Sequence, residues 1–485
     1  MNIYDRRNIS MMMDLYELTM ANGYFLSENQ DTRVAFDVFF RRNPDGGGFS
    51  IFAGLEQIAE YLLGMHFEKE DIEYLRSLGQ FDPSFLDYLS DFCFSGVLYA
   101  FPEGTIMYPG EPVITVVAPL VEAQLVETEI LAQVNHQSLI ATKAQRIVRS
   151  ARGRDVSDFG ARRAHNNDAA IYGARAAFIG GVKGTATVSA GEYFGVPVGG
   201  TMAHSFIMFY QDELTAFRKF AYIYPDNCIL LVDTYDVLKQ GVPDAIRVFA
   251  EMRDKGIKSR NYGIRIDSGD LAYLTRRSRE MLDQAGFTDA KIVISNSLDE
   301  YTIKSILDQG GAVDSFGVGE RLITSRSEPV FGAVFKLCAV DENGSFSPRI
   351  KISDSVEKIT NPGLKDVYRI YDRQGHAIAD LITESGEEVD LTKPYRIVDP
   401  LEPWKVREFS DCSGKLLQKP VIKGGELVQK LPSVRNIQKL VRDQLDGEIW
   451  PEEQRFENPH RHYVDMSPRY YEMKMDLLAN GGRSK

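Results

Sequence analysis

Between residues 154 and 345 the chain alternates short apolar segments with longer segments in which apolar residues recur at helical spacing. The longer segments include 243–256 (PDAIRVFAEMRDKG) and 271–286 (LAYLTRRSREMLDQAG), and each closes on a glycine, which is typical of a helix end. Repeated units of one strand and one helix predict a parallel sheet, either open or closed into a barrel. The clear apolar segments are 155–160, 196–201, 228–234, 262–270, 291–297 and 315–320.

Polar residues gather at one end of these predicted strands. They are Asp158, Thr201, His204, Asp233, Asp267, Asp270, Ser295, Asn296, Gly317 and Gly319. The strand ends of a (β/α) barrel line one pocket, whereas a doubly wound sheet uses only the strand ends near its switch point. So many occupied strand ends favour an irregular (β/α) barrel, with segments 185–189 and 331–337 as its remaining strands.

The rest of the chain follows different patterns. Residues 1–120 mix strand-like segments with turns, and segments 367–382 and 386–398 have the alternation of antiparallel strands. Residues 120–151 contain no glycine or proline, which predicts one long helix, or two helices joined near Asn135, bridging two domains. We therefore expect an α/β protein with an N-terminal α+β domain (1–134), a barrel (135–345) and a C-terminal segment (346–485).

The composition of the 485 residues narrows the class of protein. Hydrophobic residues make up 44% and charged residues 26%, as in soluble globular proteins, and the net charge of −13 argues against binding to nucleic acid. A local arginine cluster still allows an anionic small substrate. No segment is apolar enough to span a membrane, and Asp14 and Glu17 lie where a signal peptide needs an apolar run. The four cysteines lie far apart, as expected for reduced thiols, so we expect a soluble cytoplasmic protein.

Three strand-end segments carry groups suited to a flat, anionic ligand. In 158–165 (DFGARRAH), a phenylalanine can stack on a flat ring beside two arginines; the alternative is a surface arginine pair next to a core phenylalanine. In 265–270 (RIDSGD), carboxylates can hold ribose hydroxyls or magnesium; the alternative is a capped turn in which Asp270 begins the next helix. Segment 317–322 (GVGERL) offers glycine amides to a phosphate. Together they predict a ligand that is flat at one end and a sugar phosphate at the other.

Two histidine-containing motifs allow more than one interpretation. In GGTMAHSF, His204 lies between a glycine pair and Ser205, so it can be a nucleophile, an acid or base, or a core residue with satisfied hydrogen bonds. In ENPHRHYV, His460 and His462 suggest a metal site, but the motif offers a single carboxylate. We therefore expect these two histidines to be solvated.

Seven motifs occur in the order found in nicotinate phosphoribosyltransferases, and the chain resembles that family from the first motif to beyond ITNPGLKDVYR (359–369). The motifs are DLYELTMANGY (14–24), DFGARRAH, GGTMAHSF, LLVDTYD (230–236), RIDSGDL, SNSLDE (295–300) and GVGERLITS. The resemblance implies a type II phosphoribosyltransferase fold, in which an irregular α/β barrel lies beside an α+β domain built from the N-terminal and C-terminal segments. It also implies a homodimer in which the N-terminal region of one subunit closes the active site of the other.

The implied reaction joins nicotinate to phosphoribosyl pyrophosphate and couples this step to ATP hydrolysis. The products are nicotinate mononucleotide, pyrophosphate, ADP and phosphate, and the reaction is the first step from nicotinate to NAD. By resemblance, ATP transiently phosphorylates His204, and neighbouring hydroxyls such as that of Ser205 can hold the phosphoryl oxygens. The implied metal ion is magnesium, which Asp233 is expected to orient.

The resemblance also implies residues for each part of the substrates. They are Tyr16 (supplied by the partner subunit) and Phe159 around the pyridine ring, Thr201 and Arg265 at nicotinate, Asp267 at the ribose hydroxyls, and Gly317, Gly319 and Arg162 at the 5′-phosphate. Arginine suits the nicotinate carboxylate because a guanidinium binds carboxylates through two hydrogen bonds. No general base is required, since the pyridine nitrogen carries no proton to remove.

Two positions depart from the pattern of related enzymes. Nicotinamide phosphoribosyltransferases have an aspartate in a GTD element where this chain has Ala186, and a carboxylate there would repel nicotinate. Many relatives have threonine where this chain has Glu320. A carboxylate beside a phosphate cradle is unexpected unless it points away or faces magnesium.

Other functions fit the same residues less fully. The chain could transfer the phosphoribosyl group to nicotinamide or quinolinate, although quinolinate needs a richer basic cluster. A barrel lyase would use Lys183 to form a Schiff base. A non-enzymatic protein would bind nicotinate or phosphoribosyl pyrophosphate without releasing pyrophosphate.

Overall fold

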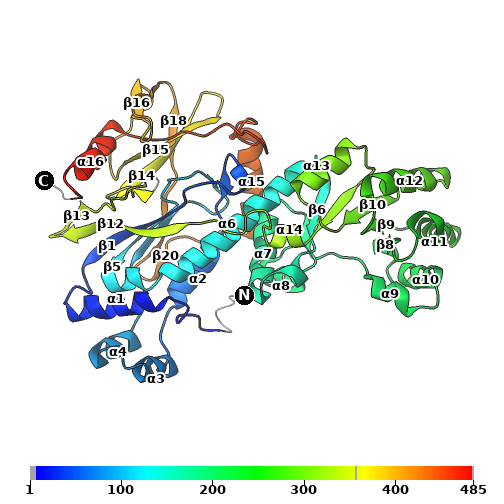
Figure 1. Ribbon diagram of the computed structural model, residues 1–485, viewed down its shortest axis with the longest axis horizontal. Coiled ribbons are helices and arrows are strands. Elements are labelled where there is room, and N and C mark those ends of the chain that lie inside the picture. The colour runs from blue at the N-terminus through cyan, green and yellow to red at the C-terminus, as the bar shows by residue number, and fades with distance from the viewer. Residues whose placement is uncertain (1–6, 356–357, 483–485) are drawn as a thin grey trace. The chain divides into compact units, whose positions relative to one another are not determined.

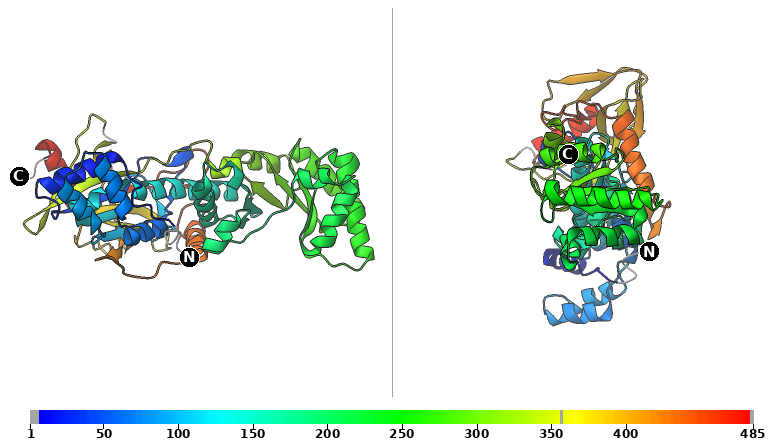
Figure 2. Two further views of the ribbon diagram at one scale, coloured as in Figure 1. Left: turned by 90° about the horizontal axis from the view of Figure 1, so that it is seen from below. Right: turned by 90° about the vertical axis from the view of Figure 1, so that its right-hand side faces the viewer.

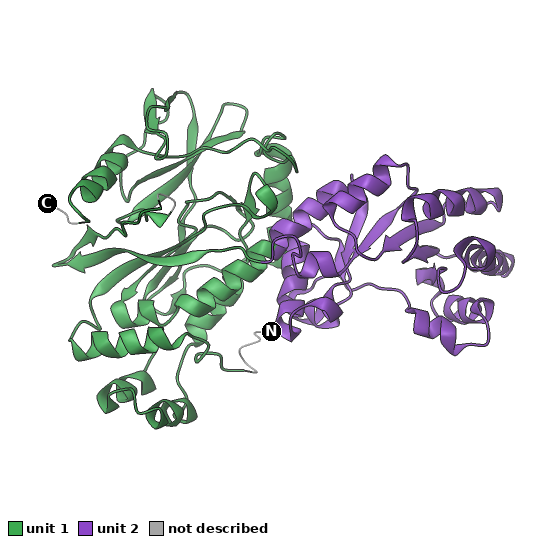
Figure 3. Ribbon diagram, in the orientation of Figure 1, with its two compact units in different colours: residues 1–139, 330–485 green, residues 140–329 purple. Residues whose placement is uncertain are grey.

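The protein forms two compact units in the computed structural model, which describes residues 7–355 and 358–482. The terminal unit comprises residues 1–139 and 330–485, and the middle unit comprises residues 140–329 (Figure 3). The boundaries expected from the sequence lie after residues 134 and 345, whereas those between the two units lie after residues 139 and 329.

The middle unit contains one parallel sheet with the strand order β7-β6-β11-β10-β9-β8. Its strands are β6 (Asp155–Asp158), β7 (Gly184–Thr185), β8 (Cys228–Leu231), β9 (Tyr262–Ile266), β10 (Lys291–Ser295) and β11 (Ser315–Val318). Its helices are the end of α6 (Glu127–Ser150), α7 (Asn167–Ile179), α8 (Val188–Phe194), α9 (His204–Phe209), α10 (Glu213–Ile223), α11 (Val242–Asp254), α12 (Leu271–Gln284), α13 (Glu300–Asp308) and α14 (Glu320–Ile323). Helices α10, α11 and α12 stand together beside β8 and β9 (Figure 1 and Figure 2).

The apolar segments form buried strands, and side chains fix where the helices begin. All four residues of β8 are buried, as expected for a parallel strand that helices cover. Asp270 accepts a hydrogen bond from the N–H of Tyr273 at 3.0 Å, and Asp299 accepts one from the N–H of Thr302 at 2.8 Å. Asp270 is therefore the capping residue that begins α12.

The sheet is curled but open, so it forms a half-barrel rather than a closed barrel. Five of the six clear apolar segments form strands. The expectation for 196–201 is wrong, because its one strand-like contact is an isolated bridge between Val198 and Thr185. Pro197 has no N–H to donate and two glycines follow, so this segment cannot extend a regular ladder.

The expectation of a strand over 185–189 is also largely wrong. β7 ends at Thr185, and α8 begins three residues later at Val188. The hydroxyl of Thr185 donates to the carboxylate of Asp158 at 2.7 Å and accepts the N–H of Thr187 at 2.9 Å. These side-chain bonds turn the chain where the ladder was expected to continue.

The segment 331–337 enters a strand, but not in the parallel sheet. β12 (Val334–Glu342) pairs antiparallel with β1 (Arg33–Phe39) in the terminal unit. Phe335 is buried there and stacks on Phe36, with ring centroids 4.8 Å apart. The apolar pattern thus predicted a strand correctly, whereas its partner depended on packing that the pattern does not specify.

The terminal unit contains a seven-stranded sheet (β13-β12-β1-β5-β3-β19-β20), a six-stranded sheet (β17-β16-β21-β15-β14-β18) and the pair β2-β4. Its further strands are β2 (Ser50–Ile51), β3 (Val97–Ala100), β4 (Ile106–Met107), β5 (Ile114–Pro119), β13 (Ser345–Pro348), β14 (Lys365–Tyr371), β15 (Ala377–Glu384), β16 (Tyr395–Val398), β17 (Val406–Phe409), β18 (Ser413–Leu416), β19 (Lys419–Lys423), β20 (Glu426–Leu427) and β21 (Val464–Met466). Its helices are α1 (Leu15–Leu26), α2 (Leu55–Gly64), α3 (Lys69–Ser77), α4 (Pro83–Ser90), α5 (Leu120–Gln124), the start of α6, α15 (Val434–Gly447) and α16 (Pro468–Ala479).

Both ends of the chain build the seven-stranded sheet. β19 pairs antiparallel with β3, and β12 pairs with β1. The predicted α+β domain made from N-terminal and C-terminal segments is therefore confirmed. The predicted hairpin over 367–382 is also present as the antiparallel pair β14 and β15.

The region 120–151 forms two helices, but they join before Asn135. α5 ends at Gln124 and α6 begins at Glu127. Asn135 lies within α6, where its side-chain oxygen accepts the N–H of Ala333 at 2.7 Å. Residues of α6 up to 139 belong to the terminal unit and later residues to the middle unit, so this helix links the two units as predicted.

His462 is buried in the terminal unit, so the expectation of a solvated histidine is wrong at this position. Its ring stacks on Tyr108 with centroids 3.8 Å apart, and its Nδ1 and Nε2 lie 3.1 Å from Glu453 and 3.7 Å from Asp380. Asp380 also accepts two hydrogen bonds, at 2.8 and 2.7 Å, from the guanidinium of Arg369. These carboxylates come from outside the HRH motif, which is why the motif alone misleads.

The charged groups of this buried network stabilise one another in their charged forms. Burial by itself would lower the pKa of His462, but the carboxylates of Asp380 and Glu453 outweigh it and raise the pKa above its ordinary value. Burial would likewise raise the pKa of Asp380, but Arg369 and His462 hold it well below the usual range.

Of the described helices, none is long and apolar enough to cross a membrane. All four cysteines are free thiols.

Candidate functional site

A cavity of about 590 Å³ lies at the carboxyl ends of the parallel strands in the middle unit. We call it the strand-end cavity. Its lining includes Phe159, Arg162, Arg163, Ala186, Thr201, His204, Arg265, Asp267, Ser295, Asn296, Ser297, Gly317, Gly319 and Glu320. Eight of the residues to which the family resemblance gives roles thus face one space, although they come from distant segments.

His204 is the first residue of the short helix α9, directly after the glycine-rich segment. Its Nδ1 lies 3.1 Å from the hydroxyl of Thr234, and its Nε2 lies 3.9 Å from a carboxylate oxygen of Asp267. The side chain is 40% exposed, so His204 is not a core residue. An accessible imidazole with a polar neighbour at each nitrogen suits a nucleophile or an acid or base.

Asp267 is held by groups from neighbouring strand ends. The hydroxyl of Ser295 donates to one of its oxygens. Asp233 does not line the cavity, but its Oδ2 accepts the N–H of Asp267 at 3.0 Å and the hydroxyl of Ser268 at 2.6 Å. The Oδ1 of Asp233 is buried and has no hydrogen-bond partner among the described residues. Asp233 therefore shapes the loop that carries Asp267 and keeps one oxygen unsatisfied.

Arg265 extends from β9 to the cavity, and its guanidinium donates to the hydroxyl of Thr201. Burial lowers the pKa of Arg265, and the carboxylates of Asp267 and Asp233 act in the opposite direction. Its Nε is buried without a hydrogen-bond partner in the described part of the chain. An arginine with an unused donor at a cavity favours an anionic acceptor such as a carboxylate.

The ring of Phe159 lies against Gly317. A Cβ atom at position 317 would lie 2.3 Å from Cε2 of Phe159, so no other residue fits there without moving the ring. At Gly319 a Cβ atom would lie 3.1 Å from the backbone oxygen of Phe159. Gly317 thus has a steric role that its motif did not predict.

Phe159 and Thr201 also line a second cavity, of about 520 Å³, at the amino ends of the strands.

Known proteins match this chain along most of its length. The N-terminal domain model of nicotinate phosphoribosyltransferase matches residues 11–135, the family model residues 155–384 and the C-terminal domain model residues 364–474. The nicotinate phosphoribosyltransferase of Bacillus subtilis (strain 168) is 43% identical over 473 residues, which cover 97% of this chain and 95% of that one. The chain belongs to the nicotinate phosphoribosyltransferase family.

Two solved structures are similar to this chain in fold. The crystal structure of human nicotinic acid phosphoribosyltransferase has a TM-score of 0.84 at 26% identity and covers 96% of this chain and 99% of that one. A nicotinate-nucleotide pyrophosphorylase from Pyrococcus furiosus has a TM-score of 0.69 at 26% identity, covering 91% and 96%. The mixed α/β fold implied by the resemblance is therefore confirmed.

The two departures from the family pattern both face the strand-end cavity. Ala186 is exposed there, and its N–H donates to the backbone oxygen of Asp158 at 2.8 Å. Glu320 pairs with the guanidinium of Arg326 at 3.1 Å. That ion pair offsets part of the negative charge that Glu320 brings to the cavity.

Besides Asp233, two further residues to which the family resemblance gives roles lie outside the lining of the cavity. Ser205 is exposed on α9 and does not line it. Tyr16 is on α1 of the terminal unit, where its side chain is 43% exposed. Burial of its hydroxyl, together with the carboxylate of Glu127, raises the pKa of Tyr16 above its ordinary value. Its place at the pyridine ring stays a prediction.

Two polar residues near His204 and Asn296 were not identified as site residues from the sequence. Thr234 directly follows Asp233 after β8, and this place at a predicted strand end was the sequence signal that could have identified it. Ser297 follows Asn296 after β10, and both adopt positive φ angles, of 50° and 80°. Asparagine tolerates this conformation, whereas serine does so at a cost in backbone strain that no sequence pattern reveals.

Proposed function

We propose that the chain transfers the phosphoribosyl group of phosphoribosyl pyrophosphate to nicotinate, giving nicotinate mononucleotide and pyrophosphate in the first step from nicotinate to NAD. We further propose that the reaction is coupled to ATP hydrolysis through phosphorylation of His204. One observation carries the proposal: in a chain of this family, Arg265, Phe159 and His204 line the same cavity.

The groups around Arg265 support nicotinate as the acceptor. The carboxylate of nicotinate would accept hydrogen bonds from this guanidinium, whose Nε is unsatisfied among the described residues. Phe159 offers a flat apolar face to the pyridine ring. Because residue 186 is alanine, this part of the cavity wall carries no carboxylate that would repel an acid.

The transfer forms a bond between the pyridine nitrogen and C1 of the ribose while the bond from C1 to the pyrophosphate oxygen breaks. Pyrophosphate leaves with the electron pair of that bond, so positive charge develops on the ribose. Asp267 lines the cavity and would hold the ribose hydroxyls close to this charge. The pyridine nitrogen has no proton to lose, so the protein mainly orients the two substrates.

His204 is the proposed acceptor of the phosphoryl group. An imidazole nitrogen attacks the γ-phosphorus of ATP, and ADP leaves with the electron pair of the broken phosphorus–oxygen bond. Water later attacks the phosphohistidine and releases phosphate. Thr234 and Asp267 support this role, because a hydroxyl at Nδ1 and a carboxylate near Nε2 fix the orientation of the ring.

Magnesium is the metal ion that the family implies, and Asp233 fits it because its buried Oδ1 lacks a hydrogen-bond partner among the described residues. No group of three or more His, Cys, Asp or Glu in the described ranges is placed to hold a metal. Magnesium would then be held by one or two carboxylates together with substrate phosphates. When bound, it offsets the negative charge of the pyrophosphate group.

The competing functions have less support. Quinolinate carries two carboxylates, and Arg265 is the one cavity arginine with an unsatisfied buried nitrogen among the described residues. The Schiff-base lyase is disfavoured because Lys183 does not line the cavity and its side chain is 71% exposed. It pairs instead with Asp155 at 3.5 Å, so no apolar environment activates the amine.

The activity is tested by measuring pyrophosphate release from phosphoribosyl pyrophosphate and magnesium. Nicotinate, nicotinamide and quinolinate are offered separately, each with and without ATP. We expect release with nicotinate, stimulated by ATP, and loss of the ATP stimulation in His204→Ala. Release with nicotinamide or quinolinate alone would contradict the proposed acceptor, and no release with any of the three would favour a binding protein.

Acceptor choice is tested separately at Ala186. Ala186→Asp should shift preference from nicotinate towards nicotinamide, because its carboxylate repels an acid and can accept from an amide. Ala186→Asn is the matched control, since it adds a similar volume without the charge. Equal effects of the two variants would mean that size, rather than charge, matters at this wall.

We also propose a cytoplasmic homodimer in which Tyr16 of one subunit completes the cavity of the other. Support comes from α1, where Leu15, Tyr16 and Met20 are 50%, 43% and 40% exposed. Mixing Tyr16→Ala and His204→Ala should restore about a quarter of the ATP-stimulated activity of the wild type, because half of the dimers would contain one intact site. No restoration after subunit exchange would contradict shared sites.

A further inference from the structure

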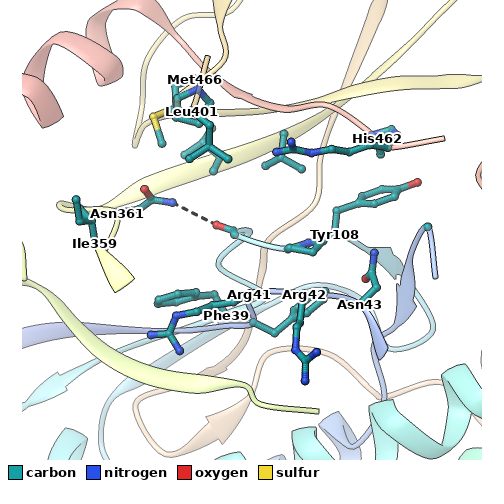
Figure 4. A pocket seen from close by; sticks show the side chains of 18 of the residues that line it. Phe39, Arg41, Arg42, Asn43, Tyr108, Ile359, Asn361, Leu401, His462 and Met466 are labelled. Carbon is teal, nitrogen blue, oxygen red and sulfur yellow. Dashed lines mark hydrogen bonds between the residues drawn. The ribbon is translucent and has the colours of Figure 1, made fainter. Parts of the chain in front are cut away.

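The terminal unit contains a cavity of about 540 Å³ that the proposed reaction does not use (Figure 4). We call it the terminal cavity. None of its lining residues lines the strand-end cavity. In the view of Figure 4, Leu401 and Met466 lie above the space and Phe39 lies below it, with Asn361 to the left and Tyr108 to the right.

The charges around the terminal cavity are all of one sign. Its basic residues are Arg41, Arg42, His460, Arg461, His462 and Lys474. No Asp or Glu is among the described residues that line it. The whole chain has the opposite balance, with 69 acidic against 56 basic residues. A cationic cavity in an acidic protein concentrates a field that attracts anions.

Lys474 and Arg461 carry the part of this charge that no ion pair among the described residues balances, and Arg461 interacts at longer range with the carboxylate of Asp465. Lys474 donates to the side-chain oxygen of Asn361 at 2.7 Å, and the amide of Asn361 is fixed in turn by a bond of 3.2 Å to the backbone oxygen of Gly110, dashed in Figure 4. Within the described ranges, neither Lys474 nor Arg461 has an ion pair with a carboxylate. Burial, with a smaller effect of Lys365, lowers the pKa of the Lys474 amine to about 8. A partly buried amine that only a neutral amide holds lacks the counter-ion that an anionic ligand would supply.

The other basic groups contribute less. Figure 4 shows the guanidinium groups of Arg41 and Arg42 pointing away from the upper wall. His462 is balanced by the carboxylates of Glu453 and Asp380. The anion contacts are therefore expected at Lys474 and Arg461.

The remaining walls of the terminal cavity are mainly apolar. They include Phe39, Ile359, Leu401, Val464, Met475 and Leu478. A cavity of this volume with apolar walls and a few placed polar groups is typical of sites for small organic molecules. Inorganic phosphate would use the cations but leave these walls uncovered.

We propose that the terminal cavity is a second small-molecule site, which binds an organic anion with an apolar body. The anionic group binds Lys474 and Arg461, and the body packs against Leu401 and Leu478. This site is independent of the proposed transfer reaction, because the two cavities share no residue. A carboxylate and a phosphate ester both satisfy this chemistry, so the test separates them.

The test is calorimetric titration of the full-length protein with octanoate, AMP and inorganic phosphate in turn. We expect saturable binding of octanoate or AMP and at least tenfold weaker binding of inorganic phosphate, which has no apolar body. Lys474→Met and Arg461→Ala should each weaken the bound probe about tenfold, as expected for loss of a charge-assisted hydrogen bond. Arg442→Ala, which removes an exposed arginine of the same unit outside the cavity, should leave binding unchanged.

A second comparison separates this site from the strand-end cavity. Arg265→Ala should keep the binding of octanoate or AMP, since Arg265 lines only the strand-end cavity. Lys474 is partly buried, so thermal melting accompanies each titration to verify folding, and the exposed Arg461 provides the milder variant. The proposal is wrong if neither organic probe binds, if Arg442→Ala weakens binding as much as Arg461→Ala does, or if binding is lost in Arg265→Ala and kept in both cavity variants.

Discussion

His204 and His462 both lie beside carboxylates and differ in almost everything else. His204 is at the strand-end cavity, 40% exposed, with Asp267 at 3.9 Å. His462 is in the terminal unit, 1% exposed, with Asp380 at 3.7 Å and Glu453 at 3.1 Å. The same pairing of imidazole and carboxylate therefore occurs at an accessible cavity in one place and in a buried network in the other, and only the first position suits the proposed chemistry.

The counter-charges explain the difference. At His462, two carboxylates and the guanidinium of Arg369 surround a buried ring, and the carboxylates balance its charge. At His204, the described hydrogen-bond partner is the neutral hydroxyl of Thr234. A neutral partner orients the ring and leaves the second nitrogen accessible, which suits the proposed role of His204 as a phosphoryl acceptor.

The largest effect is expected from breaking the buried network. Arg369→Met removes both bonds to Asp380 and leaves a buried carboxylate short of its partner, so the free energy of unfolding should fall by about 3–5 kcal/mol. Urea unfolding measures it. The matched control is Arg373→Met, because Arg373 pairs with Asp411 on the surface at 2.8 Å and should contribute less than about 1 kcal/mol. Equal losses in both variants would mean that burial does not strengthen the Arg369 pair.

The same contrast shows what the sequence could predict. His204 was identifiable because its motif is contiguous and follows a predicted strand region, and the strands β6, β8, β9, β10 and β11 were identifiable from their apolar runs. His462 was missed because Glu453 and Asp380 reach it through tertiary packing, which a local motif does not contain. For the same reason β12 was recognised as a strand but placed in the wrong sheet. Periodicity predicts an element, whereas its partner depends on the whole chain.

The next effect concerns the cavity of His204 rather than the buried network. Gly317→Ala would place a Cβ atom 2.3 Å from the ring of Phe159, so the ring must move away from the pyridine site. A displacement of about 1 Å at a reacting centre costs about 100-fold, and we expect kcat/KM for nicotinate to fall by about that factor. Steady-state kinetics measure it, with thermal melting to verify folding.

Gly199→Ala provides the contrast for this variant. Gly199 also lines the strand-end cavity, but a Cβ atom there would meet nothing within 4 Å. Its effect on kcat/KM should be much smaller than that of Gly317→Ala. If the order is reversed, the position of the Phe159 ring does not limit the reaction.

A smaller effect is expected in the pH dependence of stability. The pKa of His462 in the folded protein lies above its ordinary value of 6.5, so its charged form contributes stability that is complete below pH 6.5 and is lost as the pH rises through the folded pKa. The free energy of unfolding should fall over that range by up to about 1.4 kcal/mol per pH unit. Burial raises the pKa of Glu17 and Glu213 to about 7, and both act in the same direction.

The contribution of His462 is isolated by comparison with His462→Gln. The two glutamates are present in both proteins, so the difference between the two unfolding curves belongs to His462. That difference should shrink as the pH rises above 6.5. A constant difference over pH 6 to 9 would show that folding does not shift the pKa of this ring, which would contradict the expected upward shift.

The smallest effect tests the orientation of His204. Thr234→Val keeps the shape of the side chain but removes the hydroxyl that lies 3.1 Å from Nδ1, and one neutral hydrogen bond contributes about 1 kcal/mol. Phosphorylation of His204 by labelled ATP should therefore slow by about fivefold, because the ring spends less time in the reactive orientation. Thr392→Val is the control, since its hydroxyl bonds to Asp390 in the terminal unit. If Thr234→Val leaves phosphorylation unchanged while His204→Ala abolishes it, Asp267 alone orients the ring. His204 would then resemble His462 in depending on a carboxylate, and access to the cavity would be the main difference between the two histidines.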